Sequence, residues 1–426
     1  MNRMEKTDPL DSSGYIKREL YIRKIRPFMN REIIKILTGI RRCGKSVLLK
    51  LIQEELREQG IDRSRIIAMN FDTFENENAG NRTAESCYRE IKKQAQAAGG
   101  RIYLFLDEIQ ELEGWEKLAN SCLTELNADL YLSGSNAKML SGEYSSALSG
   151  RYVLFRIYPF SFDEAASALS KAGTSLPPPE MFDRYLVYGG MPFVYQLPFD
   201  DIAIKQYLGD IADAIILKDI SARYRIRDIG ELKRLILFLC ANTGCPFSAQ
   251  SIRKYLKNEK RNLSWETVNN YIEYCKNAFL LLPAPQEDAA GKKILKTNGK
   301  IYLTDHGIRE ALFGHNQRDI QQVLENIVYL ELLRRDYTVT IGRIGDREID
   351  FIAKKNNEKI YLQVSYLLAS PETVDRELVD REFASLAMVQ DNYPKYVLSL
   401  DEFDLSRNGI RHLNIRDFLS LPPERL

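Results

Sequence analysis

One short stretch of the chain restricts the fold more than any other. Residues 37–50 read LTGIRRCGKSVLLK, which is a glycine, four further residues and then Gly-Lys-Ser. Aliphatic residues at 33–37 predict a buried strand before it, and apolar residues at helical spacing follow it. Glycines at 39 and 44 would let the loop turn its N–H groups inward at the N-terminus of the helix. This arrangement predicts a phosphate site, whereas the alternative is an ordinary strand-to-helix turn.

The loop contains the side chains that a phosphate site needs. Lys45 would reach the β- and γ-phosphates of a nucleotide, and Ser46 would hold Mg²⁺. Cys43 is interpreted as a neutral filler of the loop and not as a redox switch. The predicted nucleotide-binding residues are Gly39, Arg41, Arg42, Cys43, Gly44, Lys45, Ser46 and Val47.

A second motif further along the chain favours the phosphate site over the ordinary turn. RIYLFLDEIQ predicts an apolar strand at 102–106 that ends in Asp107 and Glu108. Asp107 would be linked to Mg²⁺, and Glu108 would orient and deprotonate an attacking water molecule. Ser135 and Asn136, after a third apolar run, could contact the γ-phosphate or the water, or could merely cap a loop. The sequence therefore predicts hydrolysis of the nucleotide and not binding alone.

Composition limits the other possibilities. Lys and Arg total 60 and Asp and Glu total 59, so the formal charge of +1 favours neither a nucleic-acid nor a membrane partner. The six cysteines form no C-x-x-C pair, which argues against a zinc ribbon and fits a reducing cytoplasm. We see no run of 18 apolar residues and no signal peptide, so no membrane association is expected.

The order of the predicted elements suggests several domains in the 426 residues. Alternating strands and helices up to about residue 158 predict a parallel sheet covered by helices. We predict an ATPase core at 1–165, a helical lid at 166–228, a winged helix-turn-helix at 229–305 and a further α/β domain at 306–426. The predicted fold class is α/β multidomain.

The motifs GIRRCGKS, LFLDEIQ and LSGSNAKML resemble, in this order, those of AAA+-type P-loop ATPases. SGRYVLFRIYPFSFDE and YGGMP are similar to a bacterial and archaeal group of such ATPases with a C-terminal domain of unknown function. The resemblance covers nearly the whole chain and implies ATP and Mg²⁺ as cofactors.

The resemblance also implies roles for three polar residues. Asn136 matches a sensor residue, and Arg151 lies where AAA+ arginine fingers act on the nucleotide of a neighbouring subunit. A finger would require a homo-oligomer, but Arg151 could instead pair on the surface or hold phosphate in its own chain. Asn70 occupies a position where such proteins restrain the catalytic glutamate, or it caps the end of a strand.

Residues 246–305 predict two helices and a hairpin, which is the pattern of a winged helix. Ser248 and Ser264 are predicted N-caps, and GKKILKTNGKIYLTD is predicted to form a wing of two short strands. Ten Lys or Arg against five Asp or Glu between 251 and 300 suggest double-stranded DNA as a partner. The second helix, SWETVNNYIEYCK, carries few positive charges, so a protein partner remains an equal alternative.

The C-terminal region resembles the core of a PD-(D/E)xK nuclease, which would make it a restriction-endonuclease-like α/β domain. Glu325 and Asp350 match two of the family's metal-binding positions. Gln363 replaces the third carboxylate and Ser365 replaces the lysine, so binding or scaffolding is expected in place of cleavage. The sequence as a whole predicts an Mg²⁺-dependent ATPase, with a nucleotide-regulated nuclease or a non-hydrolysing ATP-gated regulator as alternatives.

Overall fold

The computed structural model describes residues 14–72, 83–137, 148, 150–198, 200–246, 252, 263–289, 294–314, 316–368 and 376–422. These residues form two compact units. The first contains Met1–Ile157 and Asn277–Phe279, and the second contains Tyr158–Lys276 and Leu280–Leu426. The predicted N-cap Ser248 lies outside the described residues, as do most of the basic residues counted between 251 and 300. The finer division at residues 165, 228 and 305 stays a prediction.

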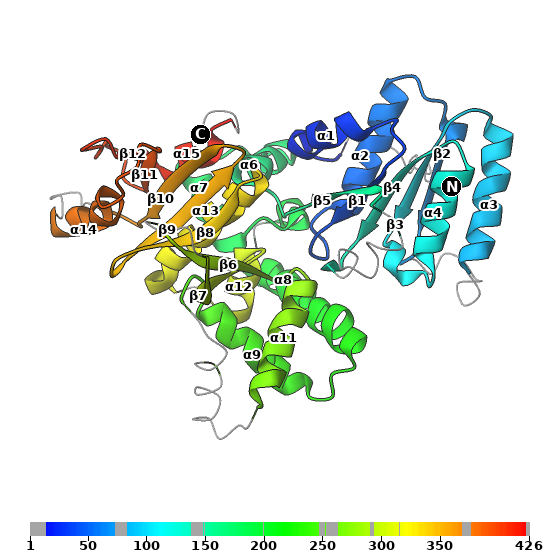
Figure 1. Ribbon diagram of the computed structural model, residues 1–426. Helices are drawn as coiled ribbons and strands as arrows, with labels where there is room; N and C mark the ends of the chain where they lie inside the picture. The colour runs from blue at the N-terminus through cyan, green and yellow to red at the C-terminus, as the bar shows by residue number, and fades with distance from the viewer. Residues whose placement is uncertain are drawn as a thin grey trace. The chain divides into compact units, whose positions relative to one another are not determined.

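The first unit is built on a parallel five-stranded sheet in the order β2-β3-β4-β1-β5 (Figure 1). Each strand is short, apolar and paired in parallel with its neighbours, as the sequence predicts. The strands are β1 (Ile34–Thr38), β2 (Ile66–Asn70), β3 (Ile102–Asp107), β4 (Ala128–Gly134) and β5 (Tyr152–Arg156). Since all five strands run the same way, the loops that follow them gather at one edge of the sheet.

Helices cover both faces of this sheet. On one face, α3 (Ala84–Ala98) and α4 (Trp115–Glu125) pack side by side against aliphatic strand residues such as Ile36 and Leu104 (Figure 1). The crossover helix α2 (Lys45–Glu58) lies against β3 and β4. Two short elements, α1 (Glu19–Ile25) and η1 (Arg26–Phe28), precede β1 in the chain. Two 3₁₀ turns lie between strands in the sequence: η2 (Arg63–Arg65) comes before β2 and η4 (Ile109–Glu111) comes after β3.

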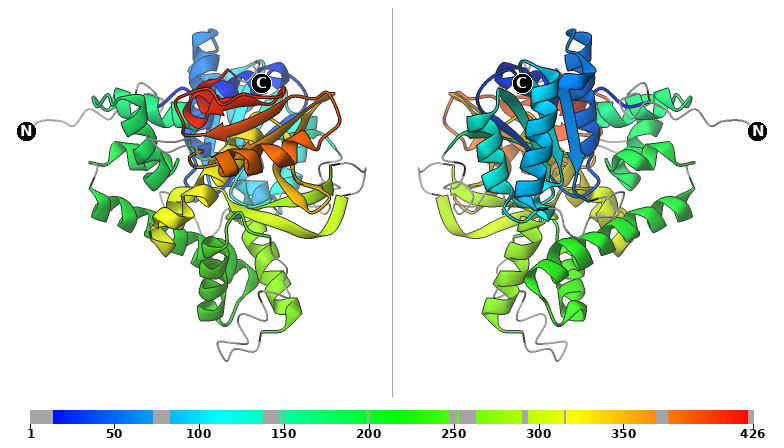
Figure 2. Two further views of the ribbon diagram at one scale, coloured as in Figure 1. Left: turned by 90° about the vertical axis from the view of Figure 1, so that its left-hand side faces the viewer. Right: turned by 90° about the vertical axis from the view of Figure 1, so that its right-hand side faces the viewer.

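The second unit contains a seven-stranded mixed sheet in the order β12-β11-β10-β9-β8-β6-β7. In Figure 2, β6 and β7 are the yellow-green strands that run side by side, and β6 also pairs in parallel with β8. These two strands therefore share one sheet with the C-terminal strands. The strands are β6 (Leu281–Asp288), β7 (Ile294–Leu303), β8 (Thr338–Ile344), β9 (Arg347–Lys355), β10 (Glu358–Val364), β11 (Lys395–Ser399) and β12 (Arg411–Asn414).

The prediction that residues 291–305 form a wing of two short strands is wrong about the number of strands. This stretch contains one long strand, β7, whose partner is the upstream strand β6. The strand continues where the prediction requires a break, and its register with β6 shifts between the pairs Ala284–Lys300 and Gln286–Leu295. A Cβ atom at Gly299 would lie 2.7 Å from the Ala284 carbonyl oxygen, so close strand packing explains this glycine.

Helices make up the rest of the second unit. The region predicted as a helical lid, residues 166–228, is helical. Within it, α8 (Asp201–Ala214) continues directly into a π-helical segment, η7 (Ile215–Ala222). The helices are α6 (Phe162–Lys171), α7 (Pro178–Tyr188), η6 (Pro192–Gln196), α8 (Asp201–Ala214), α9 (Ile229–Ala241), α11 (Trp265–Asn277), α12 (His306–Phe313), η8 (Gln317–Asp319), α13 (Ile320–Arg334), α14 (Arg376–Ala387) and α15 (Ile415–Ser420).

The YGGMP motif is a packing motif at the end of α7. A Cβ atom at Gly307 would lie 2.1 Å from the Tyr188 carbonyl oxygen, so the backbones of α7 and α12 touch directly. The Gly190 N–H donates to Asp305 at 2.7 Å, and the Tyr195 hydroxyl donates to the Gly189 carbonyl. The motif thus joins α7 to the start of α12.

Two titratable groups are buried in this contact. Burial lowers the pKa of His306 to about 4, although its Nε2 donates to the Tyr185 carbonyl at 2.6 Å. Burial raises the pKa of Asp305 to about 6, against the opposing backbone N–H groups of Gly190 and Ile308. Between about pH 4 and pH 6.5, the imidazole of His306 is therefore neutral in the folded unit but protonated in the unfolded chain.

We expect His306→Asn to change how stability depends on pH. The unfolded pKa is about 6.5 and the folded pKa is lower, so stability from the neutral imidazole is present above pH 6.5 and is lost as pH falls toward 4. The stability difference between wild type and His306→Asn should fall by up to about 1.4 kcal/mol per pH unit in this window. Urea unfolding at several pH values measures it.

Asp305→Asn provides the opposing control. Its raised folded pKa contributes stability that is present at low pH and lost as pH rises through 6, so this variant should shift the curve in the other direction. If the free energies of unfolding of wild type and His306→Asn changed in parallel with pH, the assignment of a buried neutral imidazole would be wrong.

Candidate functional site

The loop between β1 and α2 is held tightly against the end of β5. The Ile157 N–H donates to the Thr38 carbonyl at 2.6 Å, and a Cβ atom at Gly39 would lie 2.1 Å from the Ile157 oxygen. Arg42 (φ +66°) and Gly44 (φ +99°) both adopt left-handed backbone angles before α2 begins at Lys45. Such a turn aims backbone N–H groups into one concave site, which suits an anion.

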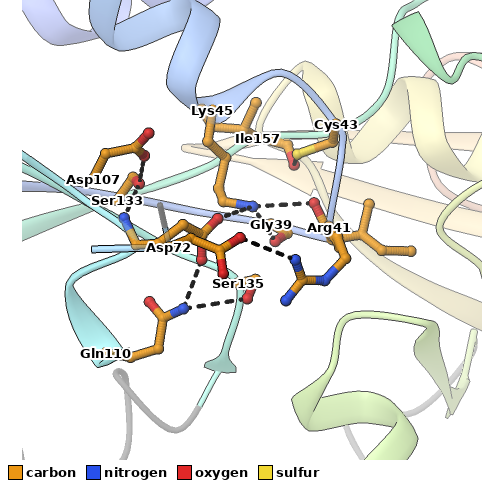
Figure 3. Close-up of polar contacts among 12 residues, drawn as sticks. Gly39, Arg41, Cys43, Lys45, Asp72, Asp107, Gln110, Ser133, Ser135 and Ile157 are labelled. Carbon is orange, nitrogen blue, oxygen red and sulfur yellow. Dashed lines mark hydrogen bonds and ion pairs between the residues drawn. The ribbon is translucent and has the colours of Figure 1, made fainter. Parts of the chain in front are cut away.

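Lys45 lies at the centre of this loop. Its ammonium group donates to the carbonyls of Gly39 at 3.1 Å and Ile40 at 3.2 Å, and lies 3.5 Å from a carboxylate oxygen of Glu108 (Figure 3). The side chain is buried, so the charge is largely shielded from water. Lys45 therefore connects the loop after β1 to the end of β3.

Asp107 is the last residue of β3 and lies at the edge of the sheet where α2 begins. The Ser133 hydroxyl of β4 donates to one carboxylate oxygen (Figure 3). The Asn70 amide donates to the other at 3.3 Å. Burial raises the pKa of Asp107, while hydrogen bonds from Ser133 and Ser46 act against that rise. The Ser46 hydroxyl and the Asp107 carboxylate are hard oxygen donors beside each other, a set that fits Mg²⁺.

Glu108 follows directly in a left-handed conformation, with φ of +50°. Its backbone N–H donates to the Ser133 oxygen at 3.0 Å, and its carboxylate accepts from the Gln110 amide at 2.6 Å. Burial would raise the pKa of Glu108, but Lys45, then Gln110 and Arg41, outweigh burial and lower it. The carboxylate is therefore ionised, as a group that accepts a proton from water must be.

The structure brings other predicted residues to this edge as well. Ser135 and Asn136 are buried after β4, and the Gln110 amide lies 3.5 Å from the Ser135 hydroxyl. Arg41 lies 3.5 Å from Asp72 (Figure 3). Arg42 is exposed, Val47 is half-buried, and the Cys43 thiol is buried against the Ile157 carbonyl at 3.4 Å. Burial raises the pKa of Cys43, which agrees with a filler.

Arg151 lies away from this edge. It precedes β5 at the end where β5 pairs with Ile34, whereas the phosphate loop follows Thr38 at the other end of β1. Four residues of strand, roughly 13 Å, separate the two ends. The Arg151 side chain lines a pocket of about 600 Å³ together with residues 123–127. Arg151 therefore precedes β5 at the opposite edge of the sheet from the phosphate loop.

Sequence reasoning missed two residues of the site. Gln110, rather than Asn70, contacts Glu108, and the only sequence signal is its position two residues after the glutamate. Arg18 is fully buried before α1, where it stacks over Tyr21 at 4.5 Å and donates to the Cys43 carbonyl at 3.1 Å. No local motif marks Arg18, because its partner is 25 residues away.

Comparison with known proteins identifies the family. Residues 31–166 match the family described as AAA domain, and residues 179–319 match a domain of unknown function (DUF8612). An uncharacterized protein of Haemophilus influenzae is 36% identical over 409 residues, which is 96% of this chain and 99% of that one. The chain belongs to this family of AAA-domain proteins. Its first unit is accordingly a P-loop ATPase fold, and the fold implies nucleotide binding.

Two further proteins are similar to this AAA-domain protein. An uncharacterized protein of Methanocaldococcus jannaschii, MJ1544, is 26% identical over 404 residues, covering 90% of this chain and 87% of that one. The Walker-type ATPase PABY2304 of Pyrococcus abyssi aligns with a TM-score of 0.48 and 16% identity, over 70% of this chain and 95% of that one. Among the described residues of the AAA-domain protein, no helix is long and apolar enough to cross a membrane.

The second unit contains a separate cluster of charged residues. Glu325 of α13 and Asp350 of β9 both lie near Lys300 of β7, whose ammonium group is 3.1 and 3.7 Å from their carboxylates. Burial would lower the pKa of Lys300, but Glu325, Asp350 and Glu348 outweigh burial and raise it. The Gln363 amide donates to Glu382 at 3.2 Å. Within the described ranges, no group of three or more His, Cys, Asp or Glu residues is arranged to hold a metal ion.

We expect Arg18→Met to weaken the phosphate loop. The change removes a charged hydrogen bond to the Cys43 carbonyl inside the protein, which should cost ~1.5–3 kcal/mol of stability. Affinity for a fluorescent ATP analogue should fall with it, because the loop loses its support. Arg23→Met, at an exposed position of α1, is the matched control and should change neither quantity. Equal affinity and unfolding midpoint in both variants would rule out this role.

Proposed function

We propose that the AAA-domain protein binds ATP with Mg²⁺ and hydrolyses it. The proposal rests above all on the convergence of Lys45, Ser46, Asp107 and Glu108 at one edge of the parallel sheet. Lys45 lies 3.5 Å from Glu108, and the Ser46 and Asp107 side chains are hydrogen-bonded neighbours. A cation for phosphate, two oxygen donors for Mg²⁺ and an ionised base thus occur together.

Each side chain would have a defined task in this reaction. The loop N–H groups and Lys45 would bind the β- and γ-phosphates, and Ser46 and Asp107 would hold Mg²⁺. Bound Mg²⁺ neutralises charge on the phosphate oxygens. Glu108 would accept a proton from the attacking water, and Asn136 would contact the γ-phosphate or that water. When Lys45 turns to phosphate, Glu108 loses its ion pair and keeps the Gln110 contact.

Arg151 supports a homo-oligomer in this proposal. Its distance from the phosphate loop of its own chain leaves action on a neighbouring subunit as the catalytic role open to it. The pocket that Arg151 lines with residues 123–127 would then lie at the contact between subunits.

The cysteines favour the cytoplasm as the location of this protein. The six cysteines are free, five of them buried, which suits a reducing compartment.

Substitutions at the predicted base and phosphate-binding lysine test the enzyme. Lys45→Ala should abolish ATP binding or turnover, whereas Glu108→Gln should bind ATP with unchanged affinity and lose at least about 100-fold in kcat. Steady-state phosphate release and titration with a fluorescent ATP analogue measure the two quantities. Lys50→Ala, one turn later on α2, is a control for loss of a lysine. Turnover of Glu108→Gln at the wild-type rate would show that Glu108 is not the base.

The second unit would present the partner-binding modules. In this proposal, α9, α11 and the β6–β7 pair form a winged helix, and the sheet β8–β12 with α13 forms a degenerate nuclease-like domain. The Ser264 hydroxyl accepts from the Thr267 N–H at 3.0 Å, which is the N-cap expected for the second helix. ATP turnover would change how these modules bind a partner.

A protein partner is the second candidate beside double-stranded DNA, and the outward face of α11 favours it. Glu266, Asn270 and Glu273 are exposed there, and Trp265 is 56% exposed at its start. Lys276 is paired with Glu273 at 2.6 Å, and Lys300 is enclosed by carboxylates. Phosphates are bound by available positive charge, and exposed tryptophan is typical of protein contacts.

ATP turnover with and without double-stranded DNA distinguishes the partners, with Lys45→Ala as background. We expect turnover to change less than twofold on adding DNA if α11 contacts protein. Stimulation of several-fold that disappears at high salt would instead establish DNA as the partner. If the partner is a protein, Trp265→Ala should reduce its capture from nuclease-treated extract. Metal-dependent DNA cleavage that survives Lys45→Ala and is lost in Asp350→Ala would establish the nuclease alternative.

A further inference from the structure

Three carboxylates in the second unit surround one ammonium group. Lys300 Nζ lies 2.7 Å from Glu348, 3.1 Å from Glu325 and 3.7 Å from Asp350. The lysine belongs to β7, Glu325 to α13, and the other two to β9. Lys300, Glu325 and Asp350 are buried, while the Glu348 side chain is 36% exposed. Below, these four residues are called the Lys300 centre.

The backbone of β9 is shaped to aim Asp350 at this centre. Thr340 and Gly342 of β8 pair with Ile352 and Ile349 of β9, so β9 carries one extra residue between these pairs. Ile349 and Ile352 pack in the same hydrophobic cluster, and Asp350 and Phe351 occupy the bulge between them. A bulge turns a side chain that strict alternation would place elsewhere. The Val364 N–H fixes the carboxylate at 2.8 Å.

The charge balance shows what Lys300 does. Three carboxylates this close repel one another, and the two that are buried, Glu325 and Asp350, are strongly unfavourable without a cation beside them. Divalent ions usually supply that cation in clusters of oxygen ligands. Here Lys300 Nζ contacts all three carboxylates, and the Tyr302 hydroxyl adds a hydrogen bond to Glu325 at 3.2 Å.

We infer that Lys300 takes the place of a divalent cation in the Lys300 centre and closes it to metal. The ammonium joins β7, α13 and β9, so the centre connects the β6–β7 pair to the C-terminal sheet. The three carboxylates lie 2.7–3.7 Å from its nitrogen, too far apart to hold a metal ion as they stand, and removing the lysine lets them move in on a smaller cation. Lys300→Ala therefore creates a site for Mn²⁺ or Mg²⁺. This inference does not depend on ATP hydrolysis.

Counting bound Mn²⁺ by electron paramagnetic resonance, without nucleotide, tests the inference. Wild type and Asp350→Asn should bind the same number of ions, because the centre of the wild-type protein is closed. Lys300→Ala should bind one more ion than wild type, and Lys300→Ala with Asp350→Asn should lose that ion. Lys354→Ala, which removes a more exposed lysine of β9 paired with Glu287, should behave as wild type.

Two results would overturn the inference. One is a wild-type protein that binds one ion more than Asp350→Asn, since metal would then displace Lys300. The other is a folded Lys300→Ala protein, by circular dichroism, that gains no ion. If Lys300→Ala does not fold, wild type against Glu325→Gln gives the same decision as wild type against Asp350→Asn.

Discussion

The contact between Gly39 and the backbone of Ile157 fixes the position of the phosphate loop. The two residues follow neighbouring parallel strands, and the oxygen of Ile157 occupies the space that any side chain at residue 39 would need. The loop is therefore confined between β5 and the start of α2. Lys45 reaches the end of β3 from this position, so a backbone contact in which neither charged residue takes part supports its ion pair with Glu108.

The sequence predicted the elements whose signal is local. An apolar strand, a glycine-rich loop and an amphipathic helix follow one another within 20 residues, and the Asp107-Glu108 pair ends a strand of five apolar residues. Parallel pairing then requires that these groups meet at one edge. The family match and the observed sheet agree with this part of the prediction.

Contacts between distant residues could not be read in the same way. Arg18 and Gln110 contact the site through partners chosen by tertiary packing, and Asn70 turned out to contact Asp107 in place of Glu108. Residues 291–305 have the composition of two short strands around a turn, yet β7 continues through them as one strand that pairs with β6 on both sides of an irregularity. Lys300 counted only as one positive charge among ten, because its carboxylate neighbours are at least 25 residues away.

The buried thiol of Cys43 has a practical consequence. It lies inside the phosphate loop with its sulfur 3.4 Å from the Ile157 oxygen and with burial raising its pKa. An alkylating reagent can reach it only when the loop separates from β5. The rate at which Cys43 is labelled would therefore report how often this loop opens, so the protein contains its own probe of loop dynamics.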